Sequence, residues 1–147
     1  MWSCVMELLC SSQMFFSRDL AAVAAVRVFV LETLRCWGLE SRVDDVCVSA
    51  SELASNAVLH TPPGRIPMRV RLSLSGGIIR LEVHDRCASL PQSVEALGDD
   101  ESGRGLLVVD ALSDKWGVDL ARYSVGKSVW AEFSLSEGLA ATPGEPL

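Results

Sequence analysis

Several features that mark common classes of protein are missing from these 147 residues. There is no CxxC pair, and with only two histidines the five cysteines cannot form a zinc site of ordinary spacing. Basic residues are outnumbered 13 to 19, and a net charge of −6 argues against a nucleic-acid binder. No stretch approaches the roughly 20 apolar residues that span a bilayer. We therefore expect a protein with neither a nucleic-acid nor a membrane partner.

The amino-terminal segment also lacks the features of a secretory signal. Met1–Cys10 is apolar, but it has no basic region, carries Glu7 and offers no small-residue cleavage site. An odd number of cysteines favours free thiols in a reducing compartment. Both observations predict a cytoplasmic location.

What the sequence does contain is enough apolar residues for one globular core. Hydrophobic residues make up 49% of the chain and charged residues 22%, which excludes a disordered protein. We expect a single domain over residues 1–135, with its core in 19–133, and a flexible tail over 136–147.

Hydrophobic periodicity predicts the order of helices and strands. Helical spacing starts after Asp19 and stops at Trp37-Gly38, and it returns from Ser41 to His60. Strict alternation predicts a hairpin whose two strands meet at Gly76-Gly77. The remaining expected elements are a strand in residues 1–10, a loop in 11–18, an aperiodic stretch over 86–105, a short helix over 106–112, and strands over 116–123 and 127–135.

These elements predict an α+β fold. We expect a two-layer α/β sandwich, in which helices cover one face of a mostly antiparallel sheet.

One group of polar residues stands out on the second predicted helix. Glu52, Asn56 and His60 follow one another at intervals of four, so they share a stripe at the edge of the apolar face. A carboxylate and a carboxamide one turn apart can serve proton transfer and Mg²⁺ binding. From spacing alone, a solvated polar face with a local hydrogen bond is the more common interpretation.

Two further candidates lie later in the chain. Gly103-Arg104-Gly105 precedes an apolar helix, where glycine amides and the helix N-terminus favour an anion, although the same residues suit an ordinary flexible start of a helix. They form neither a Walker loop nor a Rossmann turn. Asp85 ends a predicted strand, which is also a common place for a residue that simply terminates it.

In combination these segments resemble the GHKL ATPases, which include gyrase and the ATP domains of histidine kinases. The similar segments are SELASNAVLH (Ser51–His60), LEVHDRCASLP (Leu81–Pro91), GRGLLVVDALSDKWGV (Gly103–Val118) and GKSVWAEF (Gly126–Phe133). Within that group the chain is most similar to the anti-sigma-factor serine/threonine kinases. The resemblance covers about residues 19–133 and implies their Bergerat-type ATP-binding fold.

The resemblance implies a role for each candidate residue. Asn56 would ligate a Mg²⁺ that bridges the ATP phosphates, and Glu52 would be the general base for a seryl or threonyl hydroxyl. Asp85 would accept a hydrogen bond from the adenine amino group. Ser128, which stands where relatives usually carry threonine, would support that aspartate or a bound water.

The glycine-rich segment completes the implied site. Gly103, Arg104 and Gly105 would close over the phosphates. One departure from the family pattern is Cys87, since many relatives have a glycine two residues after the aspartate.

The function implied is that of an ATP- and Mg²⁺-dependent serine/threonine protein kinase that regulates transcription. Its expected partners are proteins, either a sigma factor or an antagonist that it phosphorylates, and a homodimer is compatible with the sequence. The alternative is a nucleotide-gated binding module without kinase turnover.

Overall fold

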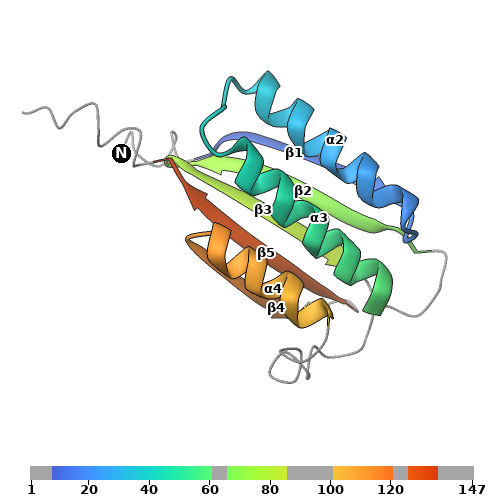
Figure 1. Ribbon diagram of the computed structural model, residues 1–147. Coiled ribbons are helices and arrows are strands. Elements are labelled where there is room, and N and C mark those ends of the chain that lie inside the picture. Colours follow the sequence, from blue (N-terminus) through green and yellow to red (C-terminus); the bar gives the residue numbers. More distant parts are fainter. Residues whose placement is uncertain (1–7, 61–65, 86–100, 121–125, 136–147) are drawn as a thin grey trace, which may run out of the picture.

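The computed structural model describes residues 8–60, 66–85, 101–120 and 126–135, with side chains for all of these except 8, 9 and 101–104. Three helices lie on one face of a five-stranded sheet (Figure 1). In chain order the elements are β1 (Leu8–Phe16), α2 (Ala21–Cys36), α3 (Val43–His60), β2 (Met68–Ser75), β3 (Ile78–Asp85), α4 (Glu101–Leu112), β4 (Lys115–Leu120) and β5 (Lys127–Ser134). The predicted α+β sandwich is confirmed.

The strands are ordered β1-β2-β3-β5-β4, and every neighbouring pair is antiparallel. Gly76 and Gly77 connect β2 to β3 and have φ values of 58° and 77°. A two-residue turn with positive φ at both positions matches the twist of its strands, which is why glycine suits it. The predicted hairpin is confirmed.

Alternation along the strands separates a core face from an open face. Ile79, Leu81 and Val83 are buried toward the helices, and their partners on β5 include Ala131 and Phe133. From α3, Val46, Ala50, Leu53 and Ala57 pack against this layer. The core therefore lies between the sheet and α3, the central helix in Figure 1.

Two elements differ from what the sequence predicts. The first strand is β1, Leu8–Phe16, so residues 11–16 form an edge strand where a loop was expected. Its weak alternation is overridden by pairing with β2 along its length. The later helix α4 begins at Glu101 and not at Leu106, because packing against α3 outweighs the low helix propensity of its glycines.

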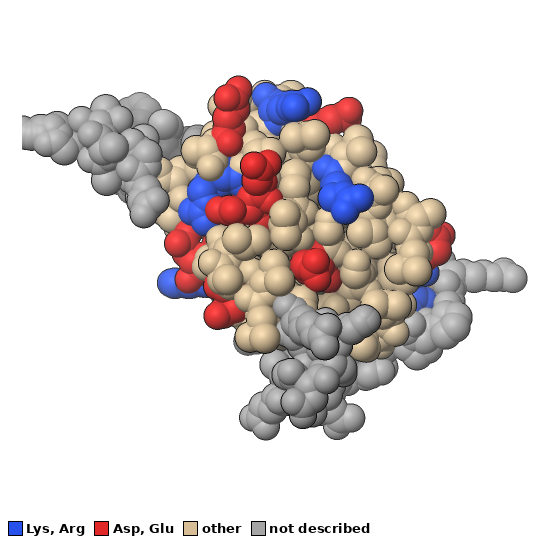
Figure 2. All heavy atoms as spheres, viewed as in Figure 1, with Lys and Arg blue, Asp and Glu red and all other residues tan. Residues whose placement is uncertain are grey.

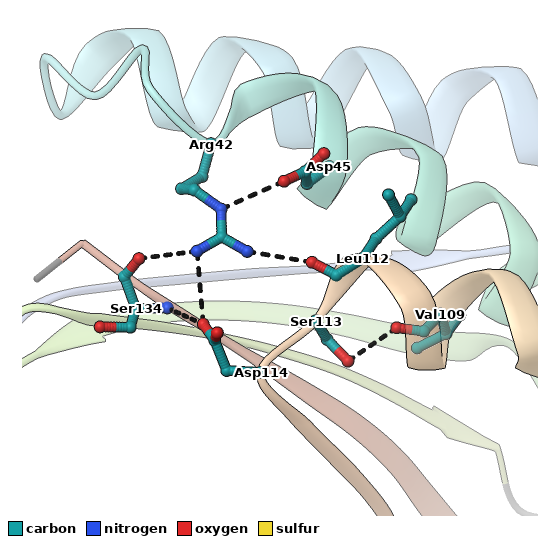
Figure 3. Close-up of polar contacts among 7 residues, drawn as sticks. All are labelled: Arg42, Asp45, Val109, Leu112, Ser113, Asp114 and Ser134. Atoms are coloured by element: carbon teal, nitrogen blue, oxygen red, sulfur yellow. Dashed lines mark hydrogen bonds and ion pairs between the residues drawn. The ribbon is translucent and has the colours of Figure 1, made fainter. Parts of the chain in front are cut away.

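Arg42 holds the carboxyl-terminal end of α4 in place (Figure 3). Its guanidinium lies 3.2 Å from Asp45 and 3.3 Å from Asp114, and it donates to the carbonyl oxygens of Leu112 at 2.9 Å and Ser134 at 2.7 Å. A rigid fork of donors can satisfy several acceptors at once. One side chain thus joins the start of α3, the end of α4 and the end of β5.

The described cysteines are free thiols, as expected. These are Cys10, Cys36 and Cys47, whereas Cys4 and Cys87 lie outside the described residues. Burial raises the pKa of Cys47, and the neighbouring Asp44 carboxylate raises that pKa further. Cys47 therefore carries little thiolate at neutral pH and is a poor nucleophile.

Among the helices that the structure describes, none is long and apolar enough to cross a membrane.

Candidate functional site

The polar stripe of α3 lies at the edge of the core, as its spacing predicts. Glu52 and Asn56 are partly buried and occupy neighbouring turns, while Leu53 and Ala57 beside them are fully packed. His60, the last residue of the helix, is exposed. The site can therefore use the carboxylate and the carboxamide, but His60 lies at the solvent-exposed end of the stripe.

The backbone of α4 passes directly over these two side chains at Gly105. A methyl group on Gly105 would lie 2.8 Å from Oε1 of Glu52, and 3.6 Å and 3.7 Å from Oδ1 and Nδ2 of Asn56. Real Cβ atoms essentially never lie within 3.0 Å of another heavy atom, so only glycine fits without a shift of the carboxylate. The structure thus brings Gly105 next to two side chains that precede it by about fifty positions in the sequence.

Gly103, Arg104 and Gly105 lie inside α4 and do not form a loop before it. They are the third to fifth residues of the helix, which begins at Glu101. The first four N–H groups of an α-helix have no intrahelical acceptor, so the amides of Gly103 and Arg104 belong to the set that can bind an anion. The Arg104 side chain is outside the described part of the structure, and its phosphate contact stays a prediction.

Asp85 is a buried carboxylate at the end of β3. Its side chain is 3% exposed, on the helix-covered face of the sheet, and Lys127 Nζ lies 3.2 Å from Oδ2 and 3.4 Å from Oδ1. The two residues are direct partners in the antiparallel register of β3 and β5. Asp85 is thus more than a strand terminator, because it takes part in a nearly buried ion pair.

The structure does not bring Ser128 to Asp85. Ser128 is paired with His84, one position along, and alternation directs side chains of successive residues to opposite faces of the sheet. Its hydroxyl is buried and has no hydrogen-bond partner among the described residues. Ser128 therefore does not contact Asp85 directly, and Lys127 lies beside Asp85 instead. Binding of a water by Ser128 stays a prediction.

Lys127 is the residue of this site that the sequence reasoning missed. A signal for it was available, because Val129, Ala131 and Phe133 alternate on the core face of β5 and Lys127 continues that series. A lysine on the core side of a strand needs a partner, and the neighbouring strand supplies one.

The family comparison agrees with this geometry. The family of the histidine kinase-like ATPase domain matches residues 16–133. The chain belongs to this family. A search of curated proteins found no match.

Among solved structures, the histidine kinase domain of the blue-light activated histidine kinase from Erythrobacter litoralis EL346 is similar to this histidine kinase-like ATPase domain. The TM-score is 0.53 at 16% sequence identity, over 84% of this chain. The match spans 66% of the length of that chain. This likeness shows the shared fold.

Family membership supports ATP binding with kinase-like or ATPase activity, and the site of this ATPase domain has suitable parts for it. The carboxyl-terminal half of α3, the start of α4, the end of β3 and the start of β5 all lie at one end of the molecule (Figure 1). These segments carry Glu52 and Asn56, Gly105, Asp85 and Lys127, respectively. The predicted base-binding and phosphate-binding residues therefore share one end of the domain.

The donor set suits a Mg²⁺ ion that is bound mainly by phosphates. No cluster of three or more His, Cys, Asp or Glu capable of holding a metal occurs among the described residues. Mg²⁺ prefers oxygen ligands and is usually held by few protein groups together with substrate phosphates. The Asn56 carboxamide, next to the carboxylate of Glu52 and the backbone of Gly105, fits that role.

Surface charge is consistent with this arrangement. Figure 2 looks onto the helix-covered face and shows acidic and basic side chains mixed across it. On this face the described residues form no broad basic surface for a polyanion, so helix amides and a bridging cation are the groups that would balance the phosphate charge.

Proposed function

We infer that this ATPase domain is an ATP- and Mg²⁺-dependent serine/threonine protein kinase that acts as an anti-sigma-type regulator of transcription by phosphorylating a protein antagonist. The observation that carries the proposal is the close approach of Gly105 to Glu52 and Asn56. That contact places a carboxylate, a carboxamide and the first turns of a helix within one small volume. The site thus combines a proton acceptor (the carboxylate), a ligand for a cation (the carboxamide) and hydrogen-bond donors for an anion (the helix amides).

Each group has a separate task in phosphoryl transfer. A bound Mg²⁺ would neutralise charge on the phosphates, and Asn56 would hold it. Glu52 would accept the proton of an incoming hydroxyl, which fits its position on the turn before Asn56. Helix amides at the start of α4 would orient the phosphates, since transfer depends on positioning and charge neutralisation more than on covalent chemistry.

The carboxylate at position 52 favours a kinase over a binding module without kinase turnover. A protein that only reports nucleotide binding needs ligands for the phosphates and the base, but it needs no proton acceptor facing the start of α4. Glu52 is partly buried there, and desolvating a carboxylate has a cost that a purely structural residue would avoid.

The decisive experiment compares Glu52→Gln with the wild type. Proteins captured by the chain in the presence of Mg-ATP are incubated with γ-labelled ATP, and the label on serine and threonine is mapped. Gln keeps the shape but cannot accept a proton, so we expect transfer to fall by about a hundredfold or more. The affinity for Mg-ATP should change by less than about threefold, because no ligand of the nucleotide is removed.

Glu32→Gln is the matched control, because Glu32 is an exposed glutamate on α2. It should label partners at the wild-type rate. Equal labelling by Glu52→Gln and the wild type would reject Glu52 as the base. Nucleotide binding without any labelling would favour the non-catalytic, nucleotide-gated module.

A further inference from the structure

The ion pair between Lys127 and Asp85 has a role left open by the proposed function. Both side chains are withdrawn from solvent, with 14% and 3% of their surfaces exposed, and the ammonium contacts both oxygens of the carboxylate. They lie on the helix-covered face, at the end of the sheet where adenine is expected to bind. An adenine ring that contacts Asp85 would therefore also contact Lys127.

A lone carboxylate is an incomplete partner for the edge of adenine. That edge presents an amino group, N6, which donates, and beside it a ring nitrogen, N1, which accepts. A carboxylate satisfies N6 but repels the lone pair of N1, and a buried acceptor without a donor is costly. A donor next to the carboxylate removes that cost.

Lys127 can supply the donor without leaving Asp85. An ammonium group has three N–H donors, and contacts with two carboxylate oxygens leave one for another acceptor. An ionised carboxylate has about four acceptor sites, so Asp85 can accept from both Lys127 and an amino group. The pair is therefore complementary to a donor and an acceptor placed side by side.

We propose that Lys127 is a specificity-determining residue that donates a hydrogen bond to N1 of adenine while Asp85 accepts one from N6. This inference rests on the proposed adenine nucleotide site. It adds Lys127 as a second residue that recognises adenine. It opposes the view that Lys127 merely blocks Asp85 until a nucleotide displaces it.

The test combines a variant with a modified ligand. Affinities of the wild type and Lys127→Met are measured by calorimetry for ADP and for 1-deaza-ADP, in which a carbon replaces N1. A hydrogen bond from a charged donor corresponds to roughly tenfold in affinity or more. We expect the wild type to bind 1-deaza-ADP about tenfold more weakly than ADP. Lys127→Met should bind both ligands equally, at the weaker level.

Lys115→Met is the matched control, because Lys115 is an exposed lysine on β4 of the same sheet. It should keep the wild-type discrimination. Tighter or unchanged binding of ADP by Lys127→Met, or an undiminished preference for ADP over 1-deaza-ADP, would overturn the role of Lys127 alone. Failure of the wild type to bind either ligand at millimolar concentration would overturn the nucleotide site itself.

The wild-type comparison needs no variant and decides the matter if Lys127→Met does not fold. Equal affinities of the wild type for ADP and 1-deaza-ADP would overturn the proposal. A tenfold loss with 1-deaza-ADP would support it.

Discussion

At Gly105 a missing side chain has two opposite physical effects. Glycine is less favourable than alanine in a helix by about 1 kcal/mol, so it weakens α4. It also leaves the room in which Oε1 of Glu52 lies, since a methyl group there would be 2.8 Å away. Helix stability would therefore favour alanine at position 105, whereas the room needed by Glu52 favours glycine.

Gly105→Ala should separate these effects. The gain in helix propensity offsets the contact with a flexible carboxylate, so the free energy of unfolding in urea should stay within about 1 kcal/mol of the wild type. Phosphoryl transfer should fall about tenfold to a hundredfold, because a displacement of Glu52 by about 1 Å is enough to disturb a reacting geometry.

Gly38→Ala gives the reverse pattern and serves as the control. Gly38 has a φ of 76°, and a methyl group added there would have no atom within 4 Å, so alanine is strained at this position but touches nothing. We expect a loss of about 1 kcal/mol in stability with transfer unchanged. A large loss of stability in Gly105→Ala would contradict this account of the site.

Helices and strands with strong periodicity could be predicted from sequence, and register could not. The helix that stops before Trp37-Gly38, the helix ending at His60 and the hairpin at Gly76-Gly77 are confirmed, because local patterns determine them. The pairing of β3 with β5 joins residues that lie about forty to sixty positions apart. A shift of one residue decides whether Ser128 or Lys127 faces Asp85, and nothing local indicates that choice.

The start of α4 was missed for a related reason. Two glycines in the segment 101–105 lower its intrinsic helix propensity, so the sequence predicts an aperiodic stretch there. Contact with α3 stabilises the helix in the folded chain, and that contact depends on the whole domain. Glu52 and Asn56 could be identified by spacing and resemblance, but their contact with Gly105 could not.

At the scale of elements, Arg42 should be the main attachment of the end of α4. Arg42→Lys keeps the charge but loses the fork that reaches Asp45, Asp114 and two carbonyl oxygens. We expect the free energy of unfolding to fall by about 2 kcal/mol, measured in urea. Arg35→Lys, at an exposed position in the last turn of α2, should change it by less than about 0.5 kcal/mol. If both variants lost a similar free energy of unfolding, Arg42 would not be the main attachment of the end of α4.

On the scale of the whole molecule, the site is assembled from α3, β3, α4 and β5, which span most of the chain. These segments come together only in the native fold, since their contacts cross large separations in sequence. A nucleotide should therefore bind the folded chain and not the unfolded one. Binding of this kind must raise the melting temperature as ligand is added.

Mg-ATP at a hundred times its dissociation constant should add about 2.7 kcal/mol to stability. For a domain of this size that corresponds to a rise of roughly 5–10 °C in melting temperature. Asp85→Asn should abolish the rise relative to its own ligand-free value, because a carboxamide cannot replace the paired carboxylate. Asp119→Asn, a change at an exposed aspartate of β4, should leave the rise intact. An undiminished rise in Asp85→Asn would remove Asp85 from the binding site.

The position of β5 has a consequence for synthesis of the protein. It is the fifth strand in chain order but lies inside the sheet, between β3 and β4. While a ribosome is still adding residues 127–134, the outer edge of β3 has no neighbour and Asp85 has no ammonium beside it. A nascent chain must keep that unpaired edge away from other chains until residues 127–134 have been added.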